Sequence, residues 1–158
     1  MGHVTFTNLK CFTRNSTIAK FQHCQIKAVN RTHKYIAVRI NNYTKNLYNF
    51  TLNIKSLRFD NGYKPFFFDV TFDACKYLKD PKHAIVNMFF KSLRTSSNLN
   101  HSCPYNHDII VDKLWTGNLE DDFLKYLPIP IGEYNLIFTL FIHNYELFSI
   151  HVFMHLSK

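Results

Sequence analysis

Residues 134–156 read YNLIFTLFIHNYELFSIHVFMHL, and this stretch decides the fold. Apolar residues recur at every second position from Tyr134 to Ile142, and again from Phe148 to Leu156. A period of two is typical of β-strands that bury one face. The residues between the two runs, His-Asn-Tyr-Glu at 143–146, predict a hairpin turn. The stretch therefore predicts two antiparallel strands with a shared apolar face.

The pairing of this hairpin decides whether its histidines can form a site. If His143 pairs with Glu146, His151 lies opposite Phe138 and His155 lies opposite Tyr134. His151 and His155 are then about 13 Å apart along one strand. That separation is too long for two ligands of one metal ion. We therefore expect no metal site in the hairpin.

The same alternation recurs earlier in the chain. It is clear at 36–40 and 48–55, where Tyr48, Phe50, Leu52 and Ile54 share one parity, and weaker strands are expected at 4–12, 20–30, 63–72 and 107–115. Arg39, Asn49 and Lys55 fall on the opposite parity and are assigned to an outer face. The 16 Phe and 9 Tyr also favour strands. We predict one mainly β domain over residues 1–158, a sandwich of about seven or eight antiparallel strands.

One segment has a helical period instead. Asp80-Pro81 is a favourable helix start, an acidic N-cap followed by proline at the first helical position. The apolar residues after it recur at helical spacing as far as Leu93. We predict a single helix over 81–94.

Cysteines and sequons point to an oxidising compartment. The four cysteines are Cys11, Cys24, Cys75 and Cys103, and none has CxxC spacing. Sequence proximity favours the pairs 11–24, which would tie a first hairpin, and 75–103, which would pin the helix to the sheet. Five N-x-[ST] sequons exceed the roughly two expected by chance. They begin at Asn15, Asn30, Asn42, Asn49 and Asn100. Together these features predict a secreted glycoprotein.

Charge and the chain start refine this interpretation. Residues 1–64 carry eleven Lys or Arg and one acid, although the whole chain has a net charge of +8. This region is either a surface for anionic partners or an ordinary solvated face. The start of the chain lacks the apolar segment of a signal peptide, so we interpret it as a mature form. No apolar run is long enough for a membrane span.

The usual catalytic patterns are missing from the sequence. There is no G-x-S-x-G nucleophile motif, and four glycines leave no phosphate-binding loop. His101 and His107 flank Cys103, but a disulfide-bonded cysteine cannot ligate a metal, so we interpret both as structural or exposed histidines. The acids at 120–122 indicate a solvated turn. Lys and Arg are dispersed singly, which argues against nucleic acid as a partner. We therefore expect no enzyme activity, cofactor or metal.

The aromatic residues leave two alternatives. In Phe66-Phe67-Phe68 consecutive side chains point to opposite sides, so either both faces are covered or one ring lies at an opening. Inward aromatic and aliphatic side chains from two sheets and a helix can enclose an apolar cavity, which is how ligand pockets are lined. They can equally form a close-packed core.

Four segments carry a resemblance to a known family: GYKPFFF at 62–68, DAC at 73–75, SNLNHSCPY at 97–105 and LPIPIGEY at 127–134. Scattered N-terminal residues add to the pattern: Phe6, Asn8, Cys11, Phe21, Cys24, Ile26, Val29 and Arg31. With these the chain resembles a large insect family of small secreted proteins that includes the chemosensory B proteins. That family is remotely similar to the ML lipid-recognition superfamily. The resemblance implies an immunoglobulin-like or ML-like sandwich that holds a lipid between its sheets, and it supplies no catalytic residues.

Two functions follow as hypotheses. The first is non-enzymatic extracellular binding of a hydrophobic small molecule, such as a lipid, a fatty-acyl compound or a pheromone-like compound, with chemosensation as its setting. By strand parity its pocket would comprise Phe66, Phe68, Met88, Phe89, Phe138, Phe148 and Val152. The alternative is a secreted interaction ligand or co-receptor with a solid core. Its basic, glycosylated face would contact a cell-surface receptor or an anionic glycan.

Overall fold

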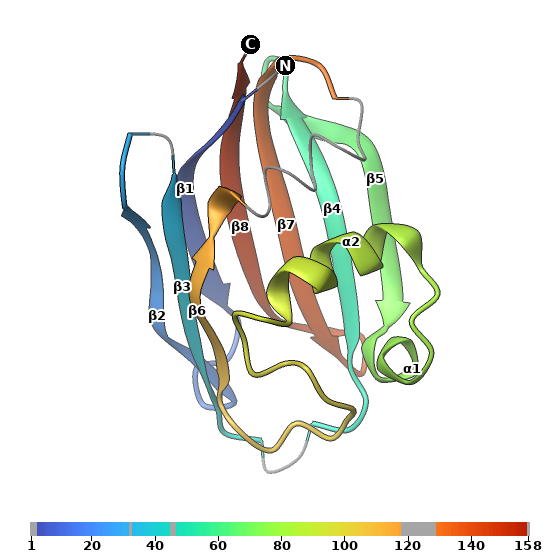
Figure 1. Ribbon diagram of the computed structural model, residues 1–158. Coiled ribbons are helices and arrows are strands. Elements are labelled where there is room, and N and C mark those ends of the chain that lie inside the picture. Colours follow the sequence, from blue (N-terminus) through green and yellow to red (C-terminus); the bar gives the residue numbers. More distant parts are fainter. Residues whose placement is uncertain (1–2, 32, 45–46, 118–128, 158) are drawn as a thin grey trace.

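Two antiparallel sheets face each other and form a β-sandwich, with two short helices packed beside them (Figure 1). The computed structural model describes residues 3–31, 33–44, 47–117 and 129–157. The larger sheet has the strand order β1-β8-β7-β4-β5, and the smaller sheet has the order β2-β3-β6. The prediction of a mainly β sandwich is therefore confirmed within these ranges. The predicted turn at 120–122 lies outside them.

The strands of the larger sheet are β1 (His3–Thr13), β8 (Tyr145–Ser157), β7 (Gly132–Ile142), β4 (Thr51–Phe59) and β5 (Tyr63–Asp73). Those of the smaller sheet are β2 (Ala19–Ala28), β3 (Lys34–Asn42) and β6 (Ile109–Trp115). Each predicted strand segment, including the four weaker ones, coincides with one of these. One side chain was misplaced: Tyr48 is 58% exposed because β4 begins only at Thr51.

The C-terminal hairpin is tighter than the sequence predicted. His143 and Asn144 both have positive φ, 50° and 65°, as a two-residue type I′ turn requires. Ile142 therefore pairs with Tyr145, and a bulge after Leu140 shifts the register by one residue. As a result His151 lies opposite Ile137 and His155 lies opposite Glu133, which corrects the predicted partners.

The helical region is also different from the prediction. Asp80 does not begin a helix; its backbone N–H donates to carbonyls at the end of α1 (Ala74–Lys79), a helix too short to give a periodic signal. The longer helix, α2 (Ala84–Leu93), begins after His83, whose ring accepts a hydrogen bond from the Val86 N–H at 3.4 Å. The single helix predicted over 81–94 is thus two helices, and the second starts later.

The Phe66–Phe68 segment interrupts the alternation of β5. Lys55 and Leu57 of β4 pair with Asp69 and Pro65, so three residues of β5 lie opposite one residue of β4. Phe67 adopts φ 75°, a strained conformation for a bulky residue, and its ring is half exposed. One ring therefore faces solvent while its two neighbours pack inward, so the two faces of the segment are not both covered, and none of the three residues lines either cavity described below.

The disulfides are Cys11–Cys24 and Cys75–Cys103, the pairs that sequence proximity favoured. The first does not tie a hairpin, because β1 pairs with β8 and β2 pairs with β3. It joins the edge strands of the two sheets. The second joins α1 to the loop before β6.

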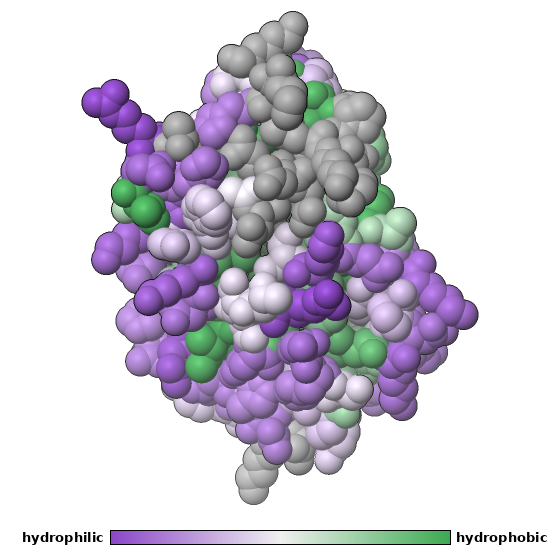
Figure 2. Space-filling model, in the orientation of Figure 1, coloured by the Kyte–Doolittle hydropathy of each residue, from purple (hydrophilic) through white to green (hydrophobic). Residues whose placement is uncertain are grey.

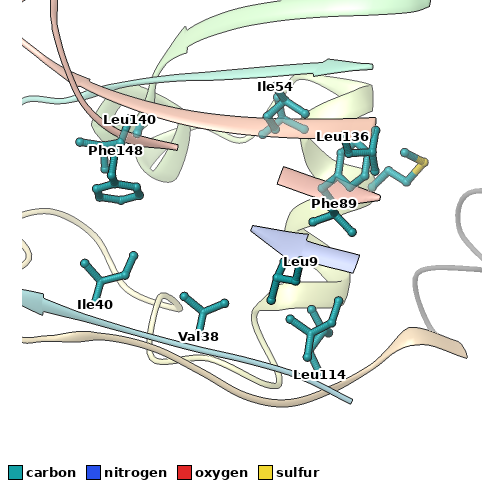
Figure 3. Packing of buried hydrophobic residues seen from close by; sticks show 14 of the residues in the cluster. Leu9, Val38, Ile40, Ile54, Phe89, Leu114, Leu136, Leu140 and Phe148 are labelled. Atoms are coloured by element: carbon teal, nitrogen blue, oxygen red, sulfur yellow. The ribbon is translucent and has the colours of Figure 1, made fainter. Parts of the chain in front are cut away.

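Buried side chains from both sheets and from α2 form one cluster between the sheets. Figure 3 shows Leu140 and Phe148 of the larger sheet on one side, opposite Val38 and Ile40 of the smaller sheet. The inner face of the hairpin formed by β7 and β8 therefore bounds one side of the core. The candidate site lies between this face and the inner face of the smaller sheet.

Candidate ligand-binding cavity

A cavity of about 180 Å³ lies between the two sheets. Its floor is the inner face of β7 and β8, and its roof is the inner face of β3 and β6, with α2 and the loop before β6 at one side. Every side chain around it is apolar or aromatic. The lining residues are Leu9, Ile36, Val38, Ile40, Phe50, Leu52, Phe89, Leu93, Leu99, Tyr105, Ile109, Val111, Leu114, Phe138, Leu140, Phe148, Ile150 and Val152.

A second cavity of about 110 Å³ adjoins the first, between α2 and the inner face of β4 and β5. Seven residues line both spaces, so the two cavities share a wall. The shared residues are Phe50, Leu52, Phe89, Leu93, Leu99, Tyr105 and Phe138.

Incomplete burial in the middle of the sheet is the physical sign of this void. Phe138 of β7 and Ile150 of β8 are direct partners in the larger sheet, yet both side chains are only half-buried. Their neighbours on the same face, Leu136 and Leu140, are only 4% and 2% exposed. Interiors are normally close-packed, so accessible side chains at the centre of a sandwich indicate space that the protein leaves unfilled.

The polar side chains at the cavity walls form hydrogen bonds within the protein. The Tyr105 hydroxyl lies 2.8 Å from the Leu99 carbonyl oxygen and 2.9 Å from that of His101, and burial raises its pKa to about 12. Asn53, at the second cavity, donates to Asp69 at 2.6 Å and to Thr71 at 2.9 Å. Among the described residues no charged side chain, histidine, serine or cysteine lines either space. The site is therefore suited to the burial of apolar groups.

The structure places four of the seven predicted pocket residues at the cavity. Phe89, Phe138, Phe148 and Val152 line it. Three do not, and this corrects the prediction: Phe66 lies in the β5 bulge against Tyr134, with ring centroids 5.7 Å apart, and Phe68 packs behind Phe89. Met88 is buried, but it is next to Phe89 in α2 and so points about 100° away from it around the helix axis.

Other lining residues were missed for two reasons. The alternating residues of β3, such as Val38, were correctly placed on an inner face, but nothing in the sequence says which strands lie opposite one another. Leu99 and Tyr105 come from a loop without any period. The sequence signal in this loop is Cys103, whose disulfide with Cys75 joins the loop to α1.

The molecular surface carries the polar features. The face seen in Figure 2 is mainly hydrophilic, with hydrophobic residues in small separate patches. Asn30, Asn49 and Asn100 are exposed, whereas Asn15 and Asn42 are half-buried. Asn42 differs further, because its side-chain amide contacts the carbonyl oxygens of Tyr105 and His107, both at 3.3 Å. In the described ranges, no helix is long and apolar enough to cross a membrane.

The fold and cavity define a class: a disulfide-bonded antiparallel β-sandwich with an apolar interior space. The chain belongs to the family described as "Protein of unknown function (DUF1091)", whose model matches residues 48–136. That region contains all four segments on which the family resemblance was based, from 62–68 to 127–134. No curated protein matches the chain.

Proposed function

We propose that this protein is a secreted, non-enzymatic binder of a small hydrophobic molecule, which it holds between its two sheets. The observation that carries the proposal is the cavity of about 180 Å³ with a wholly apolar lining. Binding sites for small molecules are concave, mainly apolar and largely pre-formed. Burial of apolar ligand surface would contribute about 25 cal/mol per Å² before the costs of association.

The volume limits what fits. An apolar cavity of about 150 Å³ is enough to stay dry and to bind a molecule the size of benzene. This protein has somewhat more space, plus the adjoining cavity behind Phe89. The polar groups at the walls are paired within the protein, so a carboxylate or phosphate would find no partner there. We therefore favour a small apolar compound, or a fatty-acyl chain whose polar end stays outside.

Three features support an extracellular setting: two disulfides, an excess of sequons and the family resemblance. The segments that resemble the chemosensory B proteins and, more remotely, the ML lipid-recognition superfamily lie in the matched region. A lipid or pheromone-like ligand in a chemosensory fluid is accordingly the setting we propose.

The alternative is an interaction ligand that uses the basic half of the chain. Several of its cations are already engaged: Arg14 pairs with Glu146 at 2.8 Å, Arg39 pairs with Asp108 at 3.3 Å, and Lys34 donates to the Phe6 carbonyl oxygen at 2.5 Å. A receptor or anionic glycan would therefore have fewer cations to contact than the sequence suggests. We therefore favour the apolar cavity over the basic surface as the binding site.

The test compares two valine-to-phenylalanine variants, both secreted from insect cells. Val111→Phe places a ring in the main cavity from β6, and Val29→Phe makes the same change at a surface position that is 53% exposed. Native mass spectrometry, before and after incubation with fatty acids, sterols and hydrocarbons, reports bound apolar mass. We expect adducts on the wild type and on Val29→Phe, and a clear loss on Val111→Phe.

Two results would overturn the proposal. One is a wild-type protein that carries no apolar mass under any loading condition. The other is a folded Val111→Phe variant that binds as well as the wild type, since the bound molecule would then lie elsewhere. Circular dichroism on each variant verifies that loss of binding is not loss of folding.

A further inference from the structure

Two histidines outside the cavity converge on each other. His101 and His107 lie in the loop between α2 and β6, on either side of Cys103. Their Nε2 atoms are 2.6 Å apart, and their ring centroids are 4.9 Å apart. His101 is exposed and His107 is half-buried, so the pair is open to solvent.

The other nitrogen of each ring determines what lies between the two Nε2 atoms. His101 Nδ1 is 2.7 Å from the carbonyl oxygen of Ser102, and His107 Nδ1 is 2.7 Å from that of Asp108. A carbonyl oxygen can only accept, so each of these contacts is a hydrogen bond in the tautomer that carries the ring hydrogen at Nδ1. The Asn98 amide donates one hydrogen to the Asp108 carbonyl oxygen at 2.6 Å, and its nitrogen is 3.1 Å from His107 Nδ1, which accepts the second hydrogen in the other tautomer of His107.

A neutral imidazole has one N–H, and in the tautomer that donates to the carbonyl oxygens each ring carries it at Nδ1. Each Nε2 therefore presents a lone pair, and the two lone pairs face each other at hydrogen-bond distance. A cation between the two nitrogens, either a proton or a metal ion, stabilises this arrangement. Histidine ligands of metals have this same pattern, in which the non-ligating ring N–H donates to a backbone carbonyl and fixes the ring.

We propose that His101 and His107 form a two-histidine site for a divalent transition metal, with zinc as the physiological candidate. Imidazole nitrogen is a ligand suited to zinc and copper. Zinc–nitrogen bonds of about 2.0–2.1 Å at a tetrahedral angle place the two nitrogens about 3.3 Å apart. The rings need to separate by less than roughly 1 Å, which rotation of two accessible side chains can supply.

Water completes the coordination. In the described part of the chain no group of three histidine, cysteine or acidic side chains gathers to hold a metal. The nearest carboxylate in the sequence, Asp108, is engaged by Arg39 and accepts from the Asn42 N–H at 2.9 Å. The site therefore has two protein ligands and open positions, which predicts moderate affinity and ready exchange of the metal.

The metal would fasten the loop that closes one side of the cavity. Leu99, two residues before His101, and Tyr105, between the two histidines, line both cavities. The Tyr105 ring lies against His101, with centroids 4.3 Å apart. A metal that joins His101 to His107 bridges the two ends of this segment, so binding stabilises its closed arrangement. The metal site itself does not depend on a ligand in the cavity.

The experiment uses the full chain with both disulfides formed, freed of metal by dialysis against a chelator. Zinc is titrated by calorimetry into the wild type, His101→Gln, His107→Gln and the control His23→Gln, an exposed histidine on β2. Long-range ¹H–¹⁵N spectra identify the nitrogens whose resonances shift. Thermal unfolding with and without zinc reports stabilisation of the folded state.

We expect one zinc ion per chain in the wild type and in His23→Gln, with resonance shifts at Nε2 of both His101 and His107. Either glutamine substitution should weaken binding at least roughly tenfold and remove the thermal shift. The proposal is overturned if zinc binds equally well to both glutamine variants. It is also overturned if the wild type binds no zinc, or if the spectra show an ordinary Nε2–H···Nε2 hydrogen bond that zinc does not displace.

Discussion

The rings of Phe89 and Phe138 meet edge to face, with centroids 5.7 Å apart and planes at 89°, in the wall shared by the two cavities. Phe89 comes from α2 and Phe138 from the centre of β7. This contact holds the helix on the larger sheet. Both rings line both cavities, so the contact forms part of the wall between them.

Removal of one ring should enlarge the site at a cost in stability. Phe89→Ala is expected to lower the free energy of unfolding by about 3–5 kcal/mol, because the ring is buried and the helix closes only partly over the gap. The two cavities should join, so longer apolar molecules should bind relative to short ones. Urea unfolding and competitive native mass spectrometry measure the two effects. Phe90→Ala, which alters only the second cavity, is the control, and an equal change in length preference there would contradict the prediction.

The two disulfides should differ in their effect on the cavity. The Cys75–Cys103 bridge holds the loop that carries Leu99 and Tyr105, whereas Cys11–Cys24 joins the sheets at their edges. Loop-closure entropy predicts a loss of about 3 kcal/mol for either pair replaced by alanine. We expect weaker retention of apolar ligands mainly after loss of the second bridge. Ligand off-rates below the unfolding temperature test this, and equal off-rates would argue against it.

The fold was more predictable than the site for identifiable reasons. Alternation over 134–142 and 148–156 specifies strands because a period of two leaves one face buried. His151 pairs with Ile137 and not with the predicted Phe138 because the turn is closed by the pair Ile142–Tyr145 and a bulge follows Leu140. A bulge leaves no periodic pattern in the sequence. Inner faces were similarly evident, but which faces oppose each other depends on tertiary pairing. The positions of the loop residues Leu99 and Tyr105 at the cavity also depend on tertiary contacts, so the sequence did not predict them.

The sequons should not be equally modified. The Asn42 amide, where the sugar would attach, contacts the carbonyl oxygens of Tyr105 and His107. Its oxygen accepts hydrogen bonds from Thr44, so the whole side chain is held in the structure. Asn49 and Asn100 are exposed. Glycopeptide mass spectrometry of the secreted protein is expected to find sugar at Asn49 and Asn100 and unmodified Asn42, and a fully occupied Asn42 would show that this loop forms after modification.

Acid should destabilise the fold through His151 on the outer face of β8. Its ring packs beside Phe12 and Phe153, and burial, together with the charge of Lys55, lowers its pKa below the ordinary value of about 6.5. The unfolded chain therefore takes up this proton first. The contribution of His151 to stability is complete above about pH 6.5 and is lost as the pH falls toward the lower pKa of the folded state.

Substitution of this histidine should reduce the sensitivity to acid. The Tm of the wild type should fall between about pH 7.5 and about pH 5, and the fall should be smaller in His151→Gln, which cannot take up a proton. The control His23→Gln leaves the β8 ring in place and should follow the wild type. If all three proteins lose the same number of degrees, the acid sensitivity arises at other groups and the role assigned to His151 is wrong.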